Sequence, residues 1–458
     1  SNAPKPRAVD EVPEVPLALV WNPYLDELWA GVRGRVVGWE GYHRAGLITK
    51  EELNYIHKVD RKRGGAGSTI FTAGDAVSAD DGPLYAQMYM SLLHRLSRVD
   101  TVQSILVLVD EMLKDHDERV TWFHQAAVGN PDFPYGPFLK CLHLDDEFVP
   151  LDASRILTTL YCASPNPIVA DMSQLSSWLQ KQLQSNNASV VDLAVQVLES
   201  LLQIKEYRKK VWDNERLVDT LVGVLKRNTT SPQMQYQVIF CFWLLTFERE
   251  VAATINKKYD IIPMTLEICK AAIKEKVVRV IIATFRNLVE IAPEANLPAM
   301  LVAKLLPYTE NLSARKWSDS EIAEDVNFVK EQLTENFQSL STFEEYASEV
   351  QTGKLEWSPP HQSETFWKQN ASRLNENDHE LVKILARLLS TSQDPLVLAV
   401  AAHDIGQYVK FGQKDAKKYV QDIGAKQKVM ELMTHPDKDV RYQALLAVQK
   451  YMVNAWEF

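Results

Sequence analysis

The sequence predicts an all-α protein in which similar helices recur along the chain. Only 17 of the 458 residues are glycine and 46% are apolar, a composition that favours helices around a sizeable core. Segments with a helical apolar stripe can be overlaid on one pattern, with 42–46 residues between successive starts. These segments begin at Val102, Phe148, Val190, Met234 and Val277 and, after a gap, at Val397 and Val440.

A repeat of this length has a physical explanation. One helix pair cannot bury its apolar faces alone, so neighbouring pairs stack into a solenoid with a continuous core. Periods of about 40–47 residues are typical of armadillo and HEAT repeats. We therefore predict an armadillo- or HEAT-like helical-repeat solenoid. The alternative is a non-repetitive helical bundle, in which amphipathic stripes also recur.

The repeat pattern is interrupted between about Pro307 and Ser390, which predicts two domains joined by a short linker. Glycine-rich and proline-containing stretches mark the less regular parts of the chain. The predicted parts are a flexible segment at 1–20 whose residues 1–3 resemble a tag remnant, a large N-terminal domain at 21–350 with a mobile loop at 61–82, a linker at 351–362, and a small C-terminal domain at 363–458.

A long helix is predicted inside the interruption. Ser318 and Glu321 form a capping-box pattern, which marks a helix start. Apolar residues then recur at spacings of three or four from Ile322 to Leu340, so one face of the helix should be buried. The surrounding residues 310–350 carry 10 acidic against 3 basic side chains, which predicts an acidic connector.

A structured joint is predicted where the domains meet. A second capping box, Ser341 with Glu344, predicts a separate helix that stops at Gly353. Two prolines follow and are expected to prevent regular structure, yet large aromatic residues surround them. A flexible linker would be rich in Gly and Ser instead. The joint residues are Gly353, Trp357, Ser358, Pro359, Pro360, His361, Phe366 and Trp367.

Charge and apolar runs exclude several classes of protein. The formal net charge is −10 without a basic face, which argues against nucleic-acid binding. The longest apolar run, around Val238–Leu245, is less than half of a bilayer span, so direct membrane insertion is not expected. No signal-peptide pattern is present, and we expect a cytosolic protein. Four cysteines in apolar surroundings are expected to be reduced: Cys141, Cys162, Cys241 and Cys269.

No catalytic constellation is evident. Residues 143–147 place His143 next to three carboxylates, but a polar turn between repeats is favoured over a metal site, because no second His or Cys pair lies at ligand spacing. A structural hydrogen-bonding role is favoured for His361, since no nucleophile or second base is nearby in sequence. None of the eleven tryptophans is followed by Asn at the fourth position, unlike in nuclear import receptors. We therefore predict a non-enzymatic protein without a cofactor or metal.

Several motifs resemble one family over nearly the whole chain. The sequence is similar to the H subunits of V-type proton ATPases, the regulatory subunits of the soluble sector. The motifs that carry the resemblance are Ile204-Lys-Glu-Tyr-Arg208, Trp243-Leu-Leu-Thr-Phe247, Arg315-Lys-Trp-Ser-Asp319, Phe343-Glu-Glu-Tyr346, Trp357-Ser-Pro-Pro-His361 with Phe366-Trp367, and His435-Pro-Asp-Lys-Asp-Val-Arg-Tyr442.

The resemblance implies a non-catalytic regulatory subunit with two helical-repeat domains. It implies that the large domain binds the peripheral-stalk subunits E and G, while the small domain lies near the cytosolic domain of membrane-sector subunit a and supports coupled proton transport. When the soluble sector detaches, the small domain is implied to reach the central rotor and catalytic head, subunits D, F and B, and to inhibit ATP hydrolysis by bridging stator and rotor. The implied location is cytoplasmic, peripheral on the cytosolic face of vacuolar and endosomal membranes.

One loop of the small domain is a candidate contact with the rotor. It follows a predicted helix at Leu381–Leu389, and its small polar residues predict an exposed turn. The loop is shorter than the corresponding loop of some family members, and an ordinary turn between helices is the alternative. The candidate rotor-facing residues are Ser390, Thr391, Ser392, Gln393, Asp394 and Pro395.

A second function, from another class, is compatible with an armadillo-like solenoid. Repeat arrays present extended concave surfaces that bind peptide segments. The chain could therefore be an armadillo-type peptide-binding adaptor in membrane trafficking. Recovery of subunits E and G from a cell lysate would favour the ATPase function, and recovery of sorting-signal cargo without them would favour the adaptor.

Overall fold

The computed structural model describes residues 20–60 and 77–453, apart from the side chains of 339–341. Most of the expected flexible segment at 1–20 and of the expected mobile loop at 61–82 lies outside the described residues. Every regular element within them is helical, which confirms the all-α prediction. Among the described helices, none combines the length and the apolar character needed to cross a membrane.

The chain divides into two compact units, which we call the first unit (residues 1–330) and the second unit (residues 331–458). The boundary falls inside helix α20 (Ser320–Thr352), whereas the large domain was predicted to end at residue 350. Residues 351–362, the predicted linker, belong to the second unit, because Leu355 packs in its apolar core and α21 contacts α24.

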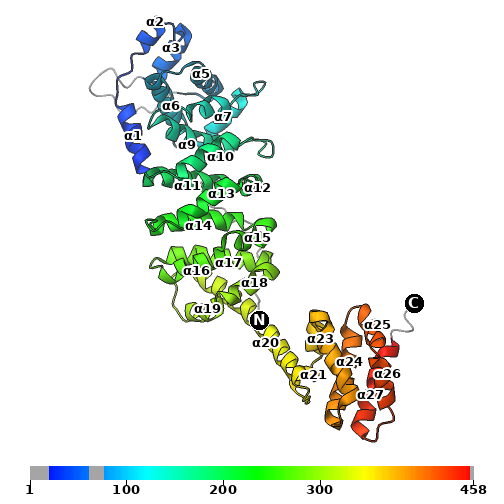
Figure 1. The fold of residues 1–458 in the computed structure, drawn as a ribbon. Coiled ribbons are helices and arrows are strands. Elements are labelled where there is room, and N and C mark those ends of the chain that lie inside the picture. The colour runs from blue at the N-terminus through cyan, green and yellow to red at the C-terminus, as the bar shows by residue number, and fades with distance from the viewer. Residues whose placement is uncertain (1–19, 61–76, 454–458) are drawn as a thin grey trace. The chain divides into compact units, whose positions relative to one another are not determined.

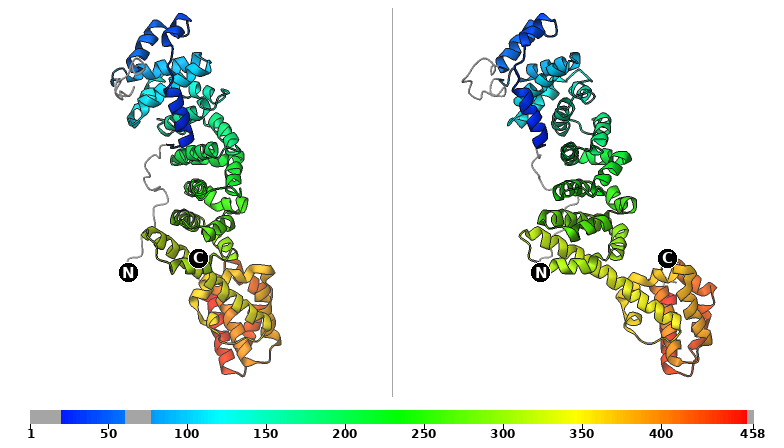
Figure 2. Two further views of the ribbon diagram at one scale, coloured as in Figure 1. Left: turned by 90° about the vertical axis from the view of Figure 1, so that its left-hand side faces the viewer. Right: turned by 60° about the vertical axis from the view of Figure 1, so that its left-hand side comes forward.

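The first unit is a stack of helices (Figures 1 and 2). Its helices are α1 (Pro23–Arg33), α2 (Trp39–Arg44), α3 (Lys50–Val59), α5 (Gly82–Arg95), α6 (Val99–Leu113), α7 (Val120–Ala126), α8 (Tyr135–Cys141), α9 (Val149–Cys162), α10 (Ser173–Leu183), α11 (Ala188–Leu202), α12 (Lys205–Asp213), α13 (Glu215–Leu225), α14 (Pro232–Leu245), α15 (Arg249–Tyr259), α16 (Ile261–Ala271), α17 (Glu275–Ile291), α18 (Pro293–Val302), α19 (Leu305–Ser313) and the start of α20, with a 3₁₀ turn at Asp117–Arg119.

The predicted repeat is confirmed in this unit. The five N-terminal segments of the sequence pattern correspond to α6, α9, α11, α14 and α17, and each of these helices packs against the next. Figure 1 shows α9, α11, α14 and α17 in succession. This arrangement buries a continuous core, as expected of a solenoid.

Buried polar groups also connect adjacent repeats, at separations close to the period. Asn287 of α17 donates from Nδ2 to Oγ1 of Thr246, 41 residues earlier, at 3.1 Å. Arg227 donates to the carbonyl oxygen of Leu183, 44 residues earlier, at 2.6 Å. Because a buried polar group without a partner costs about 1–3 kcal/mol, these bonds favour one spacing between repeats.

Helix α20 is continuous, so the predicted helix start at Ser341 is wrong. A Ser-x-x-Glu pattern is compatible with a helix interior, since Glu is a good helix former. The end at Gly353 is confirmed, where φ is +70°. The predicted box at Ser318 is displaced by one residue: Asp319 Oδ1 accepts from the N–H of Glu321 at 2.9 Å.

The predicted apolar face of α20 is confirmed over its first part. Ile322, Val326, Val329 and Leu333 are fully buried, whereas Phe337 is 53% exposed. The buried stripe therefore holds the N-terminal part of the helix, and the regular spacing in the sequence continued beyond it.

The second unit is a smaller stack of helices. Its two long helices α24 and α27 correspond to the repeat segments predicted at Val397 and Val440, and they pack along one another. Pro359 and Pro360 were expected to prevent regular structure, but they begin the one-turn helix α21, since Pro loses no hydrogen bond in a first helical turn. The helices after α20 are α21 (Pro359–Gln362), α22 (Glu364–Asn370), α23 (Glu376–Thr391), α24 (Pro395–Phe411), α25 (Asp415–Asp422), α26 (Ala425–Leu432) and α27 (Lys438–Val453), with a 3₁₀ turn at Ala371–Asn375.

Gly406 permits the close packing of α24 on α27, which leads to a first prediction. A β-carbon at Gly406 would lie 2.9 Å from Cα of Ala447. Gly406→Ala should therefore destabilise the second unit by about 1–3 kcal/mol in urea unfolding. The matched control is Gly223→Ala in α13, where a β-carbon meets no atom within 4 Å, and which should stabilise its helix by about 0.5–1 kcal/mol. Equal effects of the two substitutions would contradict the packing argument.

Candidate functional site

The residues with reactive side chains do not assemble into a catalytic or metal site within the described ranges. No group of three or more His, Cys, Asp or Glu residues is placed to hold a metal ion there. His143, Asp145 and Glu147 are exposed in a turn between helices, and Asp146 caps α9 by accepting from the N–H of Val149 at 2.8 Å. The polar-turn interpretation of residues 143–147 is therefore confirmed.

The four cysteines are free thiols in buried or half-buried positions. Burial raises the pKa of Cys141 and Cys162 to about 12. It also raises the pKa of Cys269 to about 11 and that of Cys241 well above the ordinary value. Such thiols are poor nucleophiles at neutral pH, because the reactive species is the thiolate.

The predicted joint residues surround a buried polar cluster in the second unit. His361 on α21 is fully buried between two carboxylates: Nδ1 lies 2.6 Å from Oδ2 of Asp404 on α24, and Nε2 lies 2.9 Å from Oε2 of Glu349 on α20. Tyr346 also donates its hydroxyl to Asp404 Oδ2 at 3.0 Å. An ionised carboxylate only accepts hydrogen bonds, so both ring nitrogens of His361 carry a proton.

The charge balance of the cluster explains its pKa shifts. Burial alone would lower the pKa of His361, but the ion pairs with Asp404 and Glu349 outweigh it and raise this pKa above the ordinary value. Burial alone would raise the pKa of Glu349, but hydrogen bonds from Ser358, from the backbone N–H of Glu356 and from His361 lower it. The cluster therefore holds a cationic imidazolium against two anionic carboxylates.

The aromatic joint residues enclose this cluster. Trp367 is fully buried and donates from Nε1 to the carbonyl oxygen of His361 at 2.9 Å. Phe366 packs on the Tyr346 ring with 5.0 Å between centroids, and Trp357 meets His403 edge-on at 5.0 Å. The structural role predicted for His361 is confirmed.

Three members of the cluster were missed in the sequence: Tyr346, Glu349 and Asp404. The signal available was Asp404 itself, a charged residue within the apolar stripe of a repeat helix and 43 residues after His361, close to one repeat period. Buried charges are nearly always paired, so a carboxylate in that position predicts a cationic partner.

The candidate rotor-facing loop is exposed, as predicted. Gln393, Asp394 and Pro395 are exposed between α23 and α24, and Ser392 is half-buried. Asp394 caps α24, since its Oδ1 accepts from the N–H of Leu396 at 2.9 Å. Ser390 and Thr391, which were assigned to the loop, form the last residues of α23.

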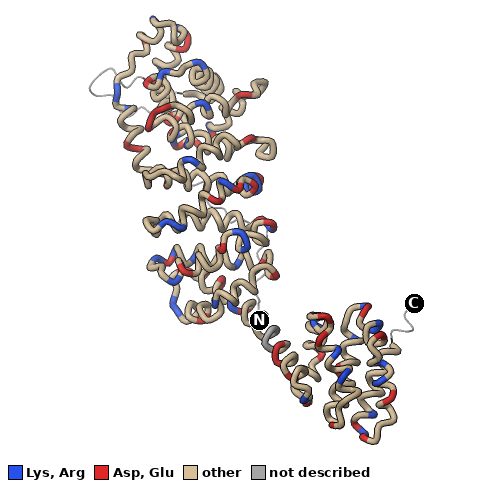
Figure 3. The backbone as a smooth tube through the Cα atoms, in the orientation of Figure 1, with Lys and Arg blue, Asp and Glu red and all other residues tan. Residues whose placement is uncertain are grey.

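A basic groove adjoins this loop. The groove has a volume of about 350 Å³ and includes Ser390, Lys383, Arg387 and Lys428 in its lining. Figure 3 shows Lys and Arg residues along α23, α25 and α26. Three cations around one groove favour an acidic partner surface.

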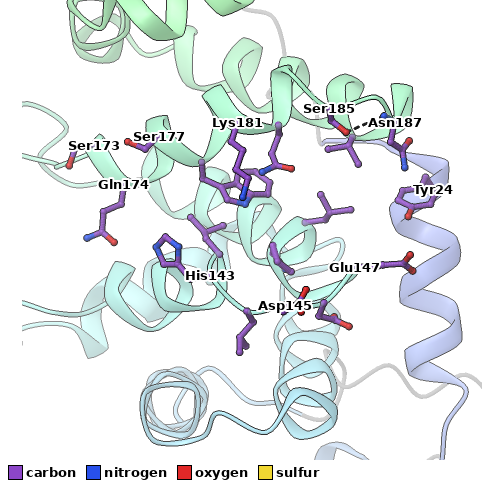
Figure 4. A pocket seen from close by; sticks show the side chains of 18 residues that line it. Tyr24, His143, Asp145, Glu147, Ser173, Gln174, Ser177, Lys181, Ser185 and Asn187 are labelled. Atoms are coloured by element: carbon purple, nitrogen blue, oxygen red, sulfur yellow. Dashed lines mark hydrogen bonds between the residues drawn. The ribbon is translucent and has the colours of Figure 1, made fainter.

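The largest cleft of the first unit lies between α10, the turn at 142–147 and α1. It has a volume of about 850 Å³. In Figure 4, Lys181 of α10 points toward the turn that carries His143 and Asp145, while Tyr24 and Glu147 lie on the α1 side. Polar and apolar groups alternate in this lining, which suits a protein segment better than a small apolar ligand.

Known proteins are similar to both units. Family models described as the H subunit of V-ATPase match residues 23–333 and 339–456. The V-type proton ATPase H subunit of Drosophila melanogaster is 37% identical over 95% of this chain and 91% of its own length. A probable V-type proton ATPase H subunit of Caenorhabditis elegans, the second of two, is 34% identical over 93% of this chain and 91% of its own length. A solved engineered protein covers 93% of this chain and 94% of its own length with 16% identity and a TM-score of 0.46, too distant to inform the fold. The chain belongs to the family of V-ATPase H subunits.

Proposed function

We propose that this chain is a non-catalytic regulatory subunit of the V-type proton ATPase. Membership of the H-subunit family over both units is the observation that carries the proposal. The chain would then bind other subunits of that complex from the cytosolic side of vacuolar and endosomal membranes. Its contribution is mechanical, since rotation stops when one body holds stator and rotor together.

The two units have separate tasks in this proposal. The first unit binds the peripheral-stalk subunits E and G through the extended surface that stacked repeats provide. In the assembled pump the second unit lies near the cytosolic domain of subunit a and supports coupled transport. In the detached soluble sector it contacts the central rotor and the catalytic head, subunits D, F and B, and inhibits ATP hydrolysis.

Tethering explains how a small second unit can act as a brake. Once the first unit is anchored, the second binding event is intramolecular and benefits from a high effective concentration, so a weak contact suffices. A change in the assembly that moves the contact out of reach then releases the brake. The exposed loop at 390–395 and the basic groove beside it are the proposed contact with the rotor.

Stalk binding provides the primary test. The full chain should bind the E–G heterodimer in calorimetry. Lys181→Glu, which reverses a charge in the 850 Å³ cleft, should weaken binding about tenfold, equivalent to about 1.4 kcal/mol. Lys209→Glu on α12 is the matched control, because Lys209 is an exposed lysine outside that cleft. Absence of binding by the unaltered chain would refute the assignment, and equal effects of the two variants would exclude the cleft.

One observation favours the peptide-binding adaptor as a second candidate. The side-chain amide of Gln196 on α11 accepts from the N–H of Trp21 and donates to its carbonyl oxygen, both at 2.8 Å. A side chain that reads the main chain in this way is suited to extended peptides, whatever their sequence. The lysate experiment with E and G versus sorting-signal cargo distinguishes the two functions.

A further inference from the structure

The last helix of the second unit has an exposed apolar stripe on the side away from the core. Tyr442, Leu445 and Met452 of α27 are 58%, 42% and 57% exposed. With Gln449 they recur at spacings of three or four, so they share one face of the helix. We call these four residues the α27 face. The ends of solenoids are normally polar, because nothing packs on them.

The preceding repeat shows what such a face does. At an offset of 43 residues, the α27 face corresponds to Ala399, Ala402, Gly406 and Val409 of α24. These residues are buried, and Gly406 is so close to α27 that a β-carbon there would lie 2.9 Å from Ala447. The corresponding face of α24 is thus the surface on which the next repeat helix packs.

We propose that the α27 face is a docking site for an amphipathic α-helix of another ATPase subunit, which packs on it as an added repeat. The argument is continuity with the α24–α27 interface, whose geometry continues by one step at the end of the unit. The identity of the partner rests on the proposed function.

The side chains of the α27 face define the partner helix further. Where α24 offers Ala, Ala and Gly, α27 offers Tyr, Leu and Gln, so the partner must carry small residues opposite them or lie farther out. α27 itself meets α24 with Ala444 and Ala447, which are small. Lys438, one turn before Tyr442, is exposed and favours an acidic residue at that end of the partner.

Site-specific cross-linking tests the proposal with the full chain. Tyr442→p-benzoylphenylalanine would be assembled with a soluble ATPase sector that lacks this chain, irradiated, and analysed by mass spectrometry. The expected product joins position 442 to a helical segment of another subunit. The same probe at Lys368, an exposed lysine of α22 outside the α27 face, should not give that product.

Other occupants are alternative outcomes of the same experiment. A cross-link to residues 454–458, a cross-link to a second copy of this chain, or no cross-link while the chain stays in the complex would each overturn the proposal. Failure of the unaltered chain to bind E–G or the soluble sector would instead refute the proposed function, and the named partner with it.

Charge substitution gives a second, quantitative measurement. Leu445→Glu with Met452→Glu should weaken binding of the chain to the soluble sector at least about tenfold, because two carboxylates cannot be buried in an apolar contact. The thermal midpoint of the free chain and its affinity for E–G should not change, since both side chains are exposed. Unchanged affinity for the soluble sector would overturn the proposal.

Discussion

Replacing His361 by alanine is expected to destabilise the second unit by about 3–5 kcal/mol, because Asp404 would keep a buried charge without a cationic partner. Glu349 would lose the same partner at its half-buried end. The measurement is urea unfolding of the full chain, followed by the fluorescence of a tryptophan such as Trp367, which lies in the second unit. The transition of the first unit should keep its midpoint.

The contribution of His361 to stability should also depend on pH. Its pKa in the folded chain is raised above the ordinary value of about 6.5, so the folded state binds the proton more tightly than the unfolded state. The contribution is therefore full below about pH 6.5 and is lost as pH rises through the folded pKa. The titratable groups around it are Tyr346, Glu349, His403 and Asp404.

A double substitution separates the imidazolium from simple packing. His361→Phe with Asp404→Leu removes both charges, so it should be less destabilising than His361→Ala alone and should flatten the pH dependence. His57→Ala is a surface control, because the His57–Glu40 pair is exposed and contributes about 0–1 kcal/mol. An effect of His361→Ala as small as that of His57→Ala would contradict the buried-charge argument.

The repeat architecture could be predicted from the sequence because its period is local information repeated many times. Segments starting at Val190, Met234 and Val277 show the same apolar spacing, and each helix buries that stripe against the next. Errors in any one segment are compensated by the others. The exposed loop was also predictable, since Asp394-Pro395 is a local turn and cap signal.

The domain boundary could not be predicted in the same way, because it depends on which contacts a continuous helix makes. Ser341 begins a capping-box pattern but lies within α20, where tertiary packing overrides the local signal. The aromatic and proline residues around Trp357 were recognised as ordered, but their partners on α20 and α24 are distant in sequence. The buried cluster required knowledge of three helices at once.

The brake prediction depends on separating a lost rotor contact from a damaged helix. Asp394 caps α24, so alanine at this position would cost about 0.5–2 kcal/mol of helix stability and confound the result. Asparagine caps a helix about as well as aspartate while removing the charge. Asp437→Asn is the matched control, because Asp437 Oδ1 caps α27 by accepting from the N–H of Val440 at 3.0 Å, in a different loop of the same unit.

Gln393→Ala with Asp394→Asn is expected to release the brake in the free soluble sector. Removing a contact worth about 1.4 kcal/mol lowers the fraction of inhibited complexes about tenfold when the brake is only weakly closed. ATP hydrolysis by the soluble sector reconstituted with this variant should therefore rise, while calorimetric binding to E–G stays unchanged. The Asp437→Asn chain should inhibit like the unaltered one. Undiminished inhibition by the loop variant would exclude residues 393–394 as the contact and leave the basic stretch Lys410–Lys418 as the next surface to substitute, because it belongs to the same unit and carries four lysines.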